Sequence, residues 1–297
     1  MATAPGDTHR TQTAPGGAAV PLEPHPWNGG FRWSEHRGPW RALTPAQAGA
    51  FDRDGHLLLE GALAREELEE LRAALDPLVE EARGFLRKVP GGRLGVAGVD
   101  TQIVAPHLVR RSGALRRFAR HPLLVDLCHD LLGPDVRLYW EQAVVKPPHS
   151  AEPVLWHQDN GYTYLEPQAY LTCWIALDDA TPENGCLRLL PGLHRRGTLR
   201  HRATPLGFEC FGDPDREVVV PMRAGSVAVF SSLTPHRTGR NRSAAPRRAY
   251  IVQYAPDGAV ALLGDPEQGP PVRRVAQADP ERQFPVLRGG RRVPAPD

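Results

Sequence analysis

Apolar residues in the first half of the chain recur at helical spacing. Thr44-Pro45-Ala46-Gln47 combines an N-cap, a proline at the first helical position and a glutamine three residues after the cap, and Gly55 supplies a stop. These signals predict a short helix. From Glu66 to Leu78 the leucines are spaced by three and four residues, which predicts an amphipathic helix. We expect Pro77 to bend or end that second helix, because proline lacks an amide hydrogen.

Two further helical patterns follow, and then the period changes to two. One helix is predicted near Ser112 and another from Leu123 to Leu131, closed by Gly133-Pro134. Short β-rich runs separated by Gly, Pro, Asn and Asp come next, at residues 136–140, 143–146, 171–177, 186–190, 217–220, 226–230 and 249–254.

Consecutive strands without helices between them favour an antiparallel sandwich or barrel. We therefore predict an α+β fold whose core is a double-stranded β-helix (a cupin-like jelly roll) flanked by N-terminal helices. Residues 41–290 are expected to form one domain. Residues 1–40 are rich in Gly and Pro and are expected to be a flexible tail, although the aromatic residues near its end could dock on the domain. Residues 291–297 are predicted to be a C-terminal tail.

Composition excludes several classes of protein and partner. The 297 residues are 41% hydrophobic and 24% charged, which is typical of a globular protein, and the net charge of +2 gives no sign of a nucleic-acid partner. The four cysteines form no CxxC pair, and no run approaches the roughly 20 apolar residues of a membrane span. We expect a cytoplasmic protein that acts on a small molecule, away from membranes. The sequence indicates no oligomeric state.

The segment Trp156-His157-Gln158-Asp159-Asn160 carries the first candidate chemistry. If it is extended, His157 and Asp159 project to the same face and can bind one ion. His236 follows a strand-like run and could supply a third ligand from a neighbouring antiparallel strand. Two histidines and one carboxylate form the facial triad of non-haem Fe(II) oxygenases, which leaves coordination positions open. A His-x-Asp triplet alone arises easily by chance in a chain with 12 histidines.

Arg247 strengthens this interpretation. It lies eleven residues after His236, at the start of the predicted strand, and a guanidinium binds a carboxylate through two parallel hydrogen bonds. An arginine beside the metal therefore suits the anchoring of a dicarboxylate. Arg248 points the other way on a strand and is expected to be solvated.

The sequence resembles the phytanoyl-CoA dioxygenase-like family of Fe(II)/2-oxoglutarate oxygenases from about Thr44 to about Tyr254. The matching motifs are HQDNGYTYL, CWIALDDATPENGCLRLLPGLHRRG and HRTGRNRSAAPRRAYIVQY. The resemblance implies Fe(II) and O2 as cofactors and 2-oxoglutarate as cosubstrate. It implies the following roles: His157, Asp159 and His236 as iron ligands and catalytic residues, Arg247 and Thr238 at the distal carboxylate of 2-oxoglutarate, and Gln142, Trp174 and Gln158 in cosubstrate binding.

The resemblance further implies hydroxylation of an unactivated C–H bond, with succinate and CO2 as coproducts. Because Asp159 is present, halogenation is disfavoured. Tyr162, Tyr164 and His201 are candidate substrate-binding residues, with packing against the sheet as the alternative for the tyrosines. His194 and Lys146 are expected to be solvent-exposed.

Two rival interpretations remain from the residues alone. A non-oxidative cupin-like metalloprotein, an isomerase or hydrolase, could use another divalent metal with the same ligands. A binding protein that has lost turnover is the second. Within the oxygenase interpretation, the Arg-biased, Gly- and Pro-rich composition suggests a bacterial biosynthetic enzyme of secondary metabolism. The loops at residues 87–100 and from Pro256 onward are expected to cap the pocket.

Overall fold

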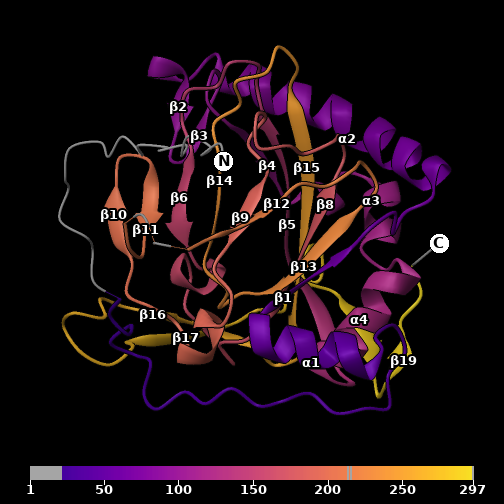
Figure 1. Cartoon of the computed structure of the whole chain (residues 1–297), viewed down its shortest axis with the longest axis vertical. Helices are drawn as coiled ribbons and strands as arrows, with labels where there is room; N and C mark the ends of the chain where they lie inside the picture. The colour runs from indigo at the N-terminus through magenta and orange to yellow at the C-terminus, as the bar shows by residue number, and fades with distance from the viewer. Residues whose placement is uncertain (1–21, 213, 215, 296–297) are drawn as a thin grey trace, which may run out of the picture.

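The computed structural model of the protein describes residues 22–212, 214 and 216–295 (Figure 1). The first helix, α1 (Pro45–Asp54), begins at a complete capping box formed by Thr44 and Gln47, and it ends at Gly55, whose φ of 80° is left-handed. Its predicted limits are thus confirmed. Two more helices also agree with the pattern: α3 (Gly113–Phe118), capped by Ser112, and α4 (Pro122–Leu132), followed by Gly133.

The second helix, α2 (Arg65–Leu86), is longer than predicted and contains Pro77 in its interior. Of the two predicted effects, a bend or an end at Pro77, the end is therefore wrong. Leu78, Val79 and Leu86 follow the proline and are all buried in the core. Burial of a large apolar side chain contributes about 1.5–3 kcal/mol, so these residues together outweigh the roughly 3 kcal/mol that an interior proline costs.

The larger sheet is antiparallel and has eight strands in the described part of the chain, in the order β1-β13-β8-β15-β5-β18-β19, with β4 also paired to β5. The runs predicted at 136–140 and 143–146 form a single strand, β5. The strands of this sheet are β1 (His56–Leu59), β4 (Ile103–Pro106), β5 (Val136–Lys146), β8 (Leu171–Ala176), β13 (Val227–Ser231), β15 (Arg247–Pro256), β18 (Pro285–Arg288) and β19 (Arg291–Arg292).

A smaller antiparallel sheet faces it, in the order β12-β9-β14-β6. Trp174 and Phe230 of the larger sheet pack against Leu187 and Leu189 of the smaller one, which fills part of the space between the two sheets. This arrangement is the predicted jelly roll. The strands are β6 (Val154–His157), β9 (Leu187–Leu189), β12 (Val218–Val220) and β14 (His236–Thr238).

Smaller elements surround the two sheets. Two hairpins, β2–β3 and β10–β11, stand beside them, and a three-stranded sheet has the order β17-β16-β7. Four short 3-10 helices complete the described elements. The strand bounds are β2 (Arg93–Leu94), β3 (Ala97–Gly98), β7 (Leu165–Glu166), β10 (Arg202–Thr204), β11 (Gly207–Glu209), β16 (Val260–Leu263) and β17 (Arg273–Ala276); the 3-10 helices are η1 (Pro90–Gly92), η2 (Leu108–Arg110), η3 (Asp159–Gly161) and η4 (Leu193–Arg196).

The helices cover the outer face of the larger sheet. Leu71 and Leu75 of α2 and Leu127 of α4 belong to the same buried cluster as Cys173 and Tyr250 of the sheet. In Figure 1, α2 runs along one side of the molecule, and it contacts β4. No helix in the described ranges combines the length and the apolar character that crossing a bilayer requires.

Both predicted tails make contacts with the domain where they are described. Trp27 donates its indole N–H to the carbonyl of Gly269 at 2.7 Å, and Trp33 donates to the carboxylate of Asp52 at 3.0 Å. The aromatic residues of this segment thus dock on the domain, whereas residues 1–21 lie outside the described residues. At the other end, Arg291 and Arg292 form β19, so strand pairing continues past residue 290.

Glu141 on β5 gives the fold a specific pH dependence. Its side chain is 1% exposed and accepts hydrogen bonds from the Val109 amide (3.1 Å) and the Tyr250 hydroxyl (2.9 Å). Burial raises the pKa of this carboxyl from 4.5 to about 7. The folded protein therefore binds a proton that the unfolded chain releases above pH 4.5. The contribution of Glu141 to the free energy of unfolding is fully present below pH 4.5 and is lost as the pH rises through about 7.

We expect Glu141→Gln, which mimics the protonated carboxyl, to stabilise the protein at pH 8 by up to about 3 kcal/mol and to have little effect at pH 5. Urea unfolding at the two pH values measures this difference. If the variant and the wild type lost stability in parallel between pH 5 and pH 8, another group would control the pH dependence.

Candidate active site

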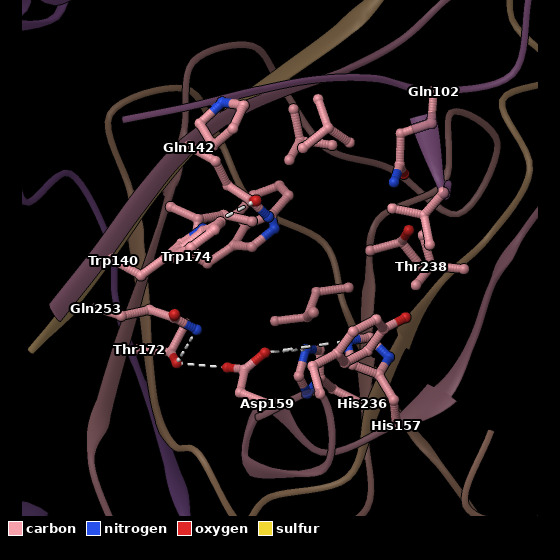
Figure 2. Close-up of a pocket in the computed structure, with 18 of the residues that line it drawn as sticks. Gln102, Trp140, Gln142, His157, Asp159, Thr172, Trp174, His236, Thr238 and Gln253 are labelled. Atoms are coloured by element: carbon pink, nitrogen blue, oxygen red, sulfur yellow. Dashed lines mark hydrogen bonds and ion pairs between the residues drawn. The ribbon is translucent and has the colours of Figure 1, made fainter. Parts of the chain in front are cut away.

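Three elements bring His157, Asp159 and His236 together. His157 is the last residue of β6, Asp159 begins η3, and His236 begins β14. Because β14 pairs antiparallel with β6, His236 stands directly opposite His157. The Oδ1 atom of Asp159 lies 3.6 Å from Nε2 of His236 and 4.0 Å from Nε2 of His157. One ligand atom from each residue lies within 4.8 Å of the others, so the three could hold one metal ion (Figure 2).

The backbone orients both imidazoles. Nδ1 of His157 lies 2.8 Å from the carbonyl of Leu155, and Nδ1 of His236 lies 3.1 Å from the carbonyl of Thr234. A carbonyl oxygen only accepts hydrogen bonds, so each Nδ1 carries a proton and Nε2 is the ring atom that can bind a metal. Burial lowers the pKa of His157 well below its ordinary value, which keeps this ring neutral.

Two residues that the sequence analysis did not single out orient Asp159. The Thr172 hydroxyl donates to Oδ2 of Asp159 at 2.5 Å, and the Gln253 amide donates to the same Thr172 hydroxyl at 3.1 Å (Figure 2). This chain occupies Oδ2 and leaves Oδ1 directed at the histidines. The two-residue period of the strands could have revealed both, since Thr172 precedes Trp174 by two positions and Gln253 follows Arg247 by six.

The triad opens into a cavity of about 380 Å³ between the two sheets, and Arg247 lines the same cavity. Arg247 is 0% exposed, and none of its three guanidinium nitrogens has a hydrogen-bond partner among the described residues. The Thr238 hydroxyl is likewise buried without a partner there. Burial lowers the pKa of Arg247 to about 10, so the guanidinium stays charged at neutral pH.

An unpaired buried cation is costly unless an anion binds it. Lys146 stands opposite Arg247 in the strand ladder, and its ammonium group donates to the carbonyls of Glu152 and Gly239 rather than to a carboxylate. The free donors of Arg247 and Thr238 therefore fit the carboxylate of a cosubstrate that reaches the metal site. Trp174 supports this end of the cavity, with the Arg247 guanidinium 5.1 Å from its ring centre.

Eight of the eleven site residues proposed from the sequence line the cavity. Gln142 also lines it and accepts a hydrogen bond from the Trp140 indole at 3.1 Å (Figure 2). Tyr162 lies at the cavity wall, with its ring 5.2 Å from that of His157. The eight residues are Gln142, His157, Asp159, Tyr162, Trp174, His236, Thr238 and Arg247.

Gln158, predicted to bind the cosubstrate, lies outside the cavity. The strand ends at His157 and Asp159 begins a 3-10 turn, so the segment is not extended throughout as assumed. The buried Gln158 amide instead donates to the carbonyls of Gly197 and Leu233 and accepts from the amide of Leu199. The side chain therefore ties three backbone segments together behind the triad.

Two predicted substrate-binding residues also lie outside the cavity. The Tyr164 hydroxyl donates to the carbonyl of Trp27 at 3.0 Å, so the ring packs under the N-terminal segment. Nε2 of His201 accepts the backbone N–H of Gln158 at 2.9 Å, which supports the turn between the ligands. A Cβ atom on Gly161 would lie 2.1 Å from the His201 ring, so only glycine fits beside it.

Four further expectations are wrong. Lys146 is 0% exposed, because it extends inward from β5. His194 is also buried and contacts the carbonyl of Asp52 at 3.1 Å. Arg248 forms ion pairs with Asp178 and Asp76 at 2.8 and 2.9 Å, so it is not merely solvated. Of the two expected capping loops, residues 87–100 contribute Arg93 and Val96 to the cavity, whereas no described residue after Gln253 lines it.

Comparison with known proteins identifies the family. The model of the phytanoyl-CoA dioxygenase (PhyH) family matches residues 51–249, which include the triad and Arg247. The chain belongs to the phytanoyl-CoA dioxygenase family. This membership confirms the predicted family and the predicted enzyme class, a dioxygenase that depends on iron and 2-oxoglutarate.

Relatives within and around the phytanoyl-CoA dioxygenase family act on different molecules. A methylphosphonate hydroxylase of Gimesia maris is 30% identical over 227 residues, which are 71% of this chain and 80% of that protein. A probable alpha-ketoglutarate-dependent hypophosphite dioxygenase of Stutzerimonas stutzeri is 32% identical over 169 residues, which are 54% of this chain and 58% of that protein. The epimerase SnoN, solved with Fe3+, alpha ketoglutarate and nogalamycin RO, has a TM-score of 0.63 at 25% identity, covering 81% of this chain and 98% of that chain.

The position of Gln158 leads to a prediction about stability. Gln158→Ala leaves two buried carbonyls and one buried amide without partners, and each costs about 1–3 kcal/mol. We expect the free energy of unfolding, measured in urea, to fall by at least about 3 kcal/mol. Gln102→Ala is the control, since the Gln102 side-chain carbonyl has no partner among the described residues. Unchanged stability of Gln158→Ala would contradict the structural role and favour the predicted role in cosubstrate binding.

Proposed function

We propose that the protein hydroxylates an unactivated C–H bond of a small organic molecule, with Fe(II) bound by His157, Asp159 and His236. Arg247 and Thr238 bind the distal carboxylate of 2-oxoglutarate. The observation that carries the proposal is that the unpaired Arg247 guanidinium lines the same cavity as the three metal-ligating side chains. A metal site that served hydrolysis or isomerisation of a neutral substrate would have no use for a buried free cation there.

Each side chain has a separate task in this reaction. When bound, iron and 2-oxoglutarate together activate dioxygen, and succinate and CO2 are the coproducts. His157 and His236 offer lone pairs at Nε2, and Asp159 offers Oδ1 while Thr172 holds Oδ2. Partners of this kind orient a ligand and tune the metal. Arg247 and Thr238 fix one end of the cosubstrate, and the buried walls exclude water from the reacting centre.

The biological setting is part of the proposal. The net charge of +2 supports a partner other than nucleic acid, and the relatives act on small molecules, so we infer a small-molecule substrate. The likeness to SnoN, whose solved complex contains nogalamycin RO, supports a role in a bacterial biosynthetic pathway of secondary metabolism. We also propose that the protein works in the cytoplasm.

Anaerobic titration with Fe(II) and then 2-oxoglutarate tests the metal site. Chelation of Fe(II) by the keto acid produces a visible charge-transfer band, which we expect for the wild type and not for His157→Ala or Asp159→Ala. His194→Ala is the control, because this buried histidine lies outside the cavity. Tight binding of another divalent metal without any band would favour the non-oxidative cupin-like metalloprotein.

The unpaired state of Arg247 predicts opposite effects on stability and on binding. Arg247→Met removes two or more charge-assisted hydrogen bonds, so we expect 2-oxoglutarate to bind about 30-fold or more weakly. Because the buried cation has no partner among the described residues, the free variant should be as stable as the wild type or more so.

Arg248→Met is the matched control for this prediction. It breaks the ion pairs with Asp178 and Asp76, so it should lower stability and leave the affinity for 2-oxoglutarate unchanged. Thermal unfolding with and without 2-oxoglutarate measures both quantities. An Arg247→Met variant that binds 2-oxoglutarate as tightly as the wild type would overturn the assignment of the anchor.

A further inference from the structure

The wall of the cavity beside the metal ligands is aromatic. A β-bulge in β5 places Leu138 opposite Tyr254 and Trp140 opposite Gln253, so Tyr139 is the extra residue. A bulge redirects side chains, and here both Tyr139 and Trp140 line the cavity. Tyr170 packs edge to face on Tyr139, with ring centres 5.0 Å apart. Tyr162 adds a fourth ring to the lining, beside His157, and the aromatic wall is defined here as Tyr139, Trp140, Tyr162 and Tyr170.

This wall carries no charge at neutral pH. Burial raises the pKa of the Tyr139 hydroxyl to about 12 and that of Tyr170 well above its ordinary value, so both remain neutral phenols. Apart from the triad and Arg247, the charged residues that line the cavity are Arg93 and Glu152. These two pair with each other, with Nη1 of Arg93 2.9 Å from Oε1 of Glu152. Among the described lining residues, no cation is therefore left for an anionic substrate.

Two hairpins add apolar residues to the lining, beside the paired Arg93. The hairpins β2–β3 and β10–β11 contribute Val96 and Leu206. Gly207 brings the two hairpins together, since a Cβ atom there would lie 2.8 Å from the Tyr162 hydroxyl and 3.0 Å from Val96. Tyr162 is 39% exposed beside this contact, so the cavity opens to solvent there.

We propose that the substrate is an uncharged, largely apolar molecule containing one or more rings, which the aromatic wall binds and Tyr162 meets at the entrance. The proposal rests on the proposed function of the same cavity. Iron and 2-oxoglutarate take part of the cavity of about 380 Å³, at the triad and at Arg247, so the aromatic wall and the hairpin residues line the part that is left for a substrate. A small oxyanion such as methylphosphonate would lose its hydration there without gaining a cationic side chain.

Two probes that share one ring system test the charge preference. The full chain is loaded anaerobically with Fe(II) and 2-oxoglutarate, and the binding of 2-naphthol, 2-naphthyl phosphate and methylphosphonate is measured by tryptophan fluorescence and by changes in the charge-transfer band. We expect 2-naphthol to bind about tenfold or more tightly than 2-naphthyl phosphate, and methylphosphonate not to bind.

Variants locate the probe within the cavity. Tyr162→Ala and Trp140→Leu should each weaken 2-naphthol binding by about fivefold. Phe85→Ala is the control, because this 57% exposed aromatic residue on α2 does not line the cavity. Glu152→Gln releases Arg93 from its ion pair, so it should tighten the binding of 2-naphthyl phosphate and narrow the gap between the two naphthyl probes.

Several results would overturn the proposal. These are tighter binding of 2-naphthyl phosphate or of methylphosphonate than of 2-naphthol, failure of 2-naphthol to bind although the band forms, and unchanged affinity in both wall variants. Failure of the proposed function is distinct, because the band itself would be missing. In that case the affinities of the same three probes are compared on the metal-free wild type and variants. The order of these affinities still tests whether the aromatic wall prefers an uncharged ring.

Discussion

The antiparallel pairing of β14 with β6 is the constraint on which the rest of the site depends. It sets His236 directly opposite His157, and it carries Thr238 along the same short strand into the cavity. A shift by one residue would turn every side chain of β14 to the opposite face of the sheet. The larger sheet contributes Thr172 and Gln253, which lie behind Asp159, and it contributes Arg247 at the opposite end of the cavity.

Arg247 carries a cost in stability that the proposed cosubstrate would relieve. Burial between two sheets removes the guanidinium from water, and the described residues return no hydrogen bond to it. That cost is present before any ligand binds, so a carboxylate that enters relieves it and gains affinity. The neighbouring Lys146 donates to backbone carbonyls and brings no carboxylate to Arg247.

The sequence predicted the parts of the site that depend on short-range patterns. His157 and Asp159 are two residues apart, and Arg247 begins a predicted strand, so residue type and spacing proposed these three residues, which line one cavity. The jelly roll followed from strands without intervening helices. Gln158, Tyr164 and Lys146 were misplaced because their environment comes from distant segments. Gln158 bonds to residues 197, 199 and 233, and Tyr164 packs under residue 27.

Pro77 was misjudged for a related reason. The local cost of an interior proline can be read from the sequence, but the core that buries Leu78, Val79 and Leu86 beyond it cannot. Tertiary packing therefore decided where the helix ends.

The bulge at Tyr139 has a consequence for how such a protein can diversify. One extra residue in β5 decides which side chains face the cavity near the metal ligands, whereas seven residues further on the same strand Lys146 still pairs in register with Arg247. Insertion or deletion of a single residue at the bulge would change which aromatic side chains face the cavity. The pairing of Lys146 with Arg247 at the other end of the strand would stay the same. Descendants of this chain could therefore acquire new substrates by a local change of strand geometry while they inherit the oxidative machinery intact.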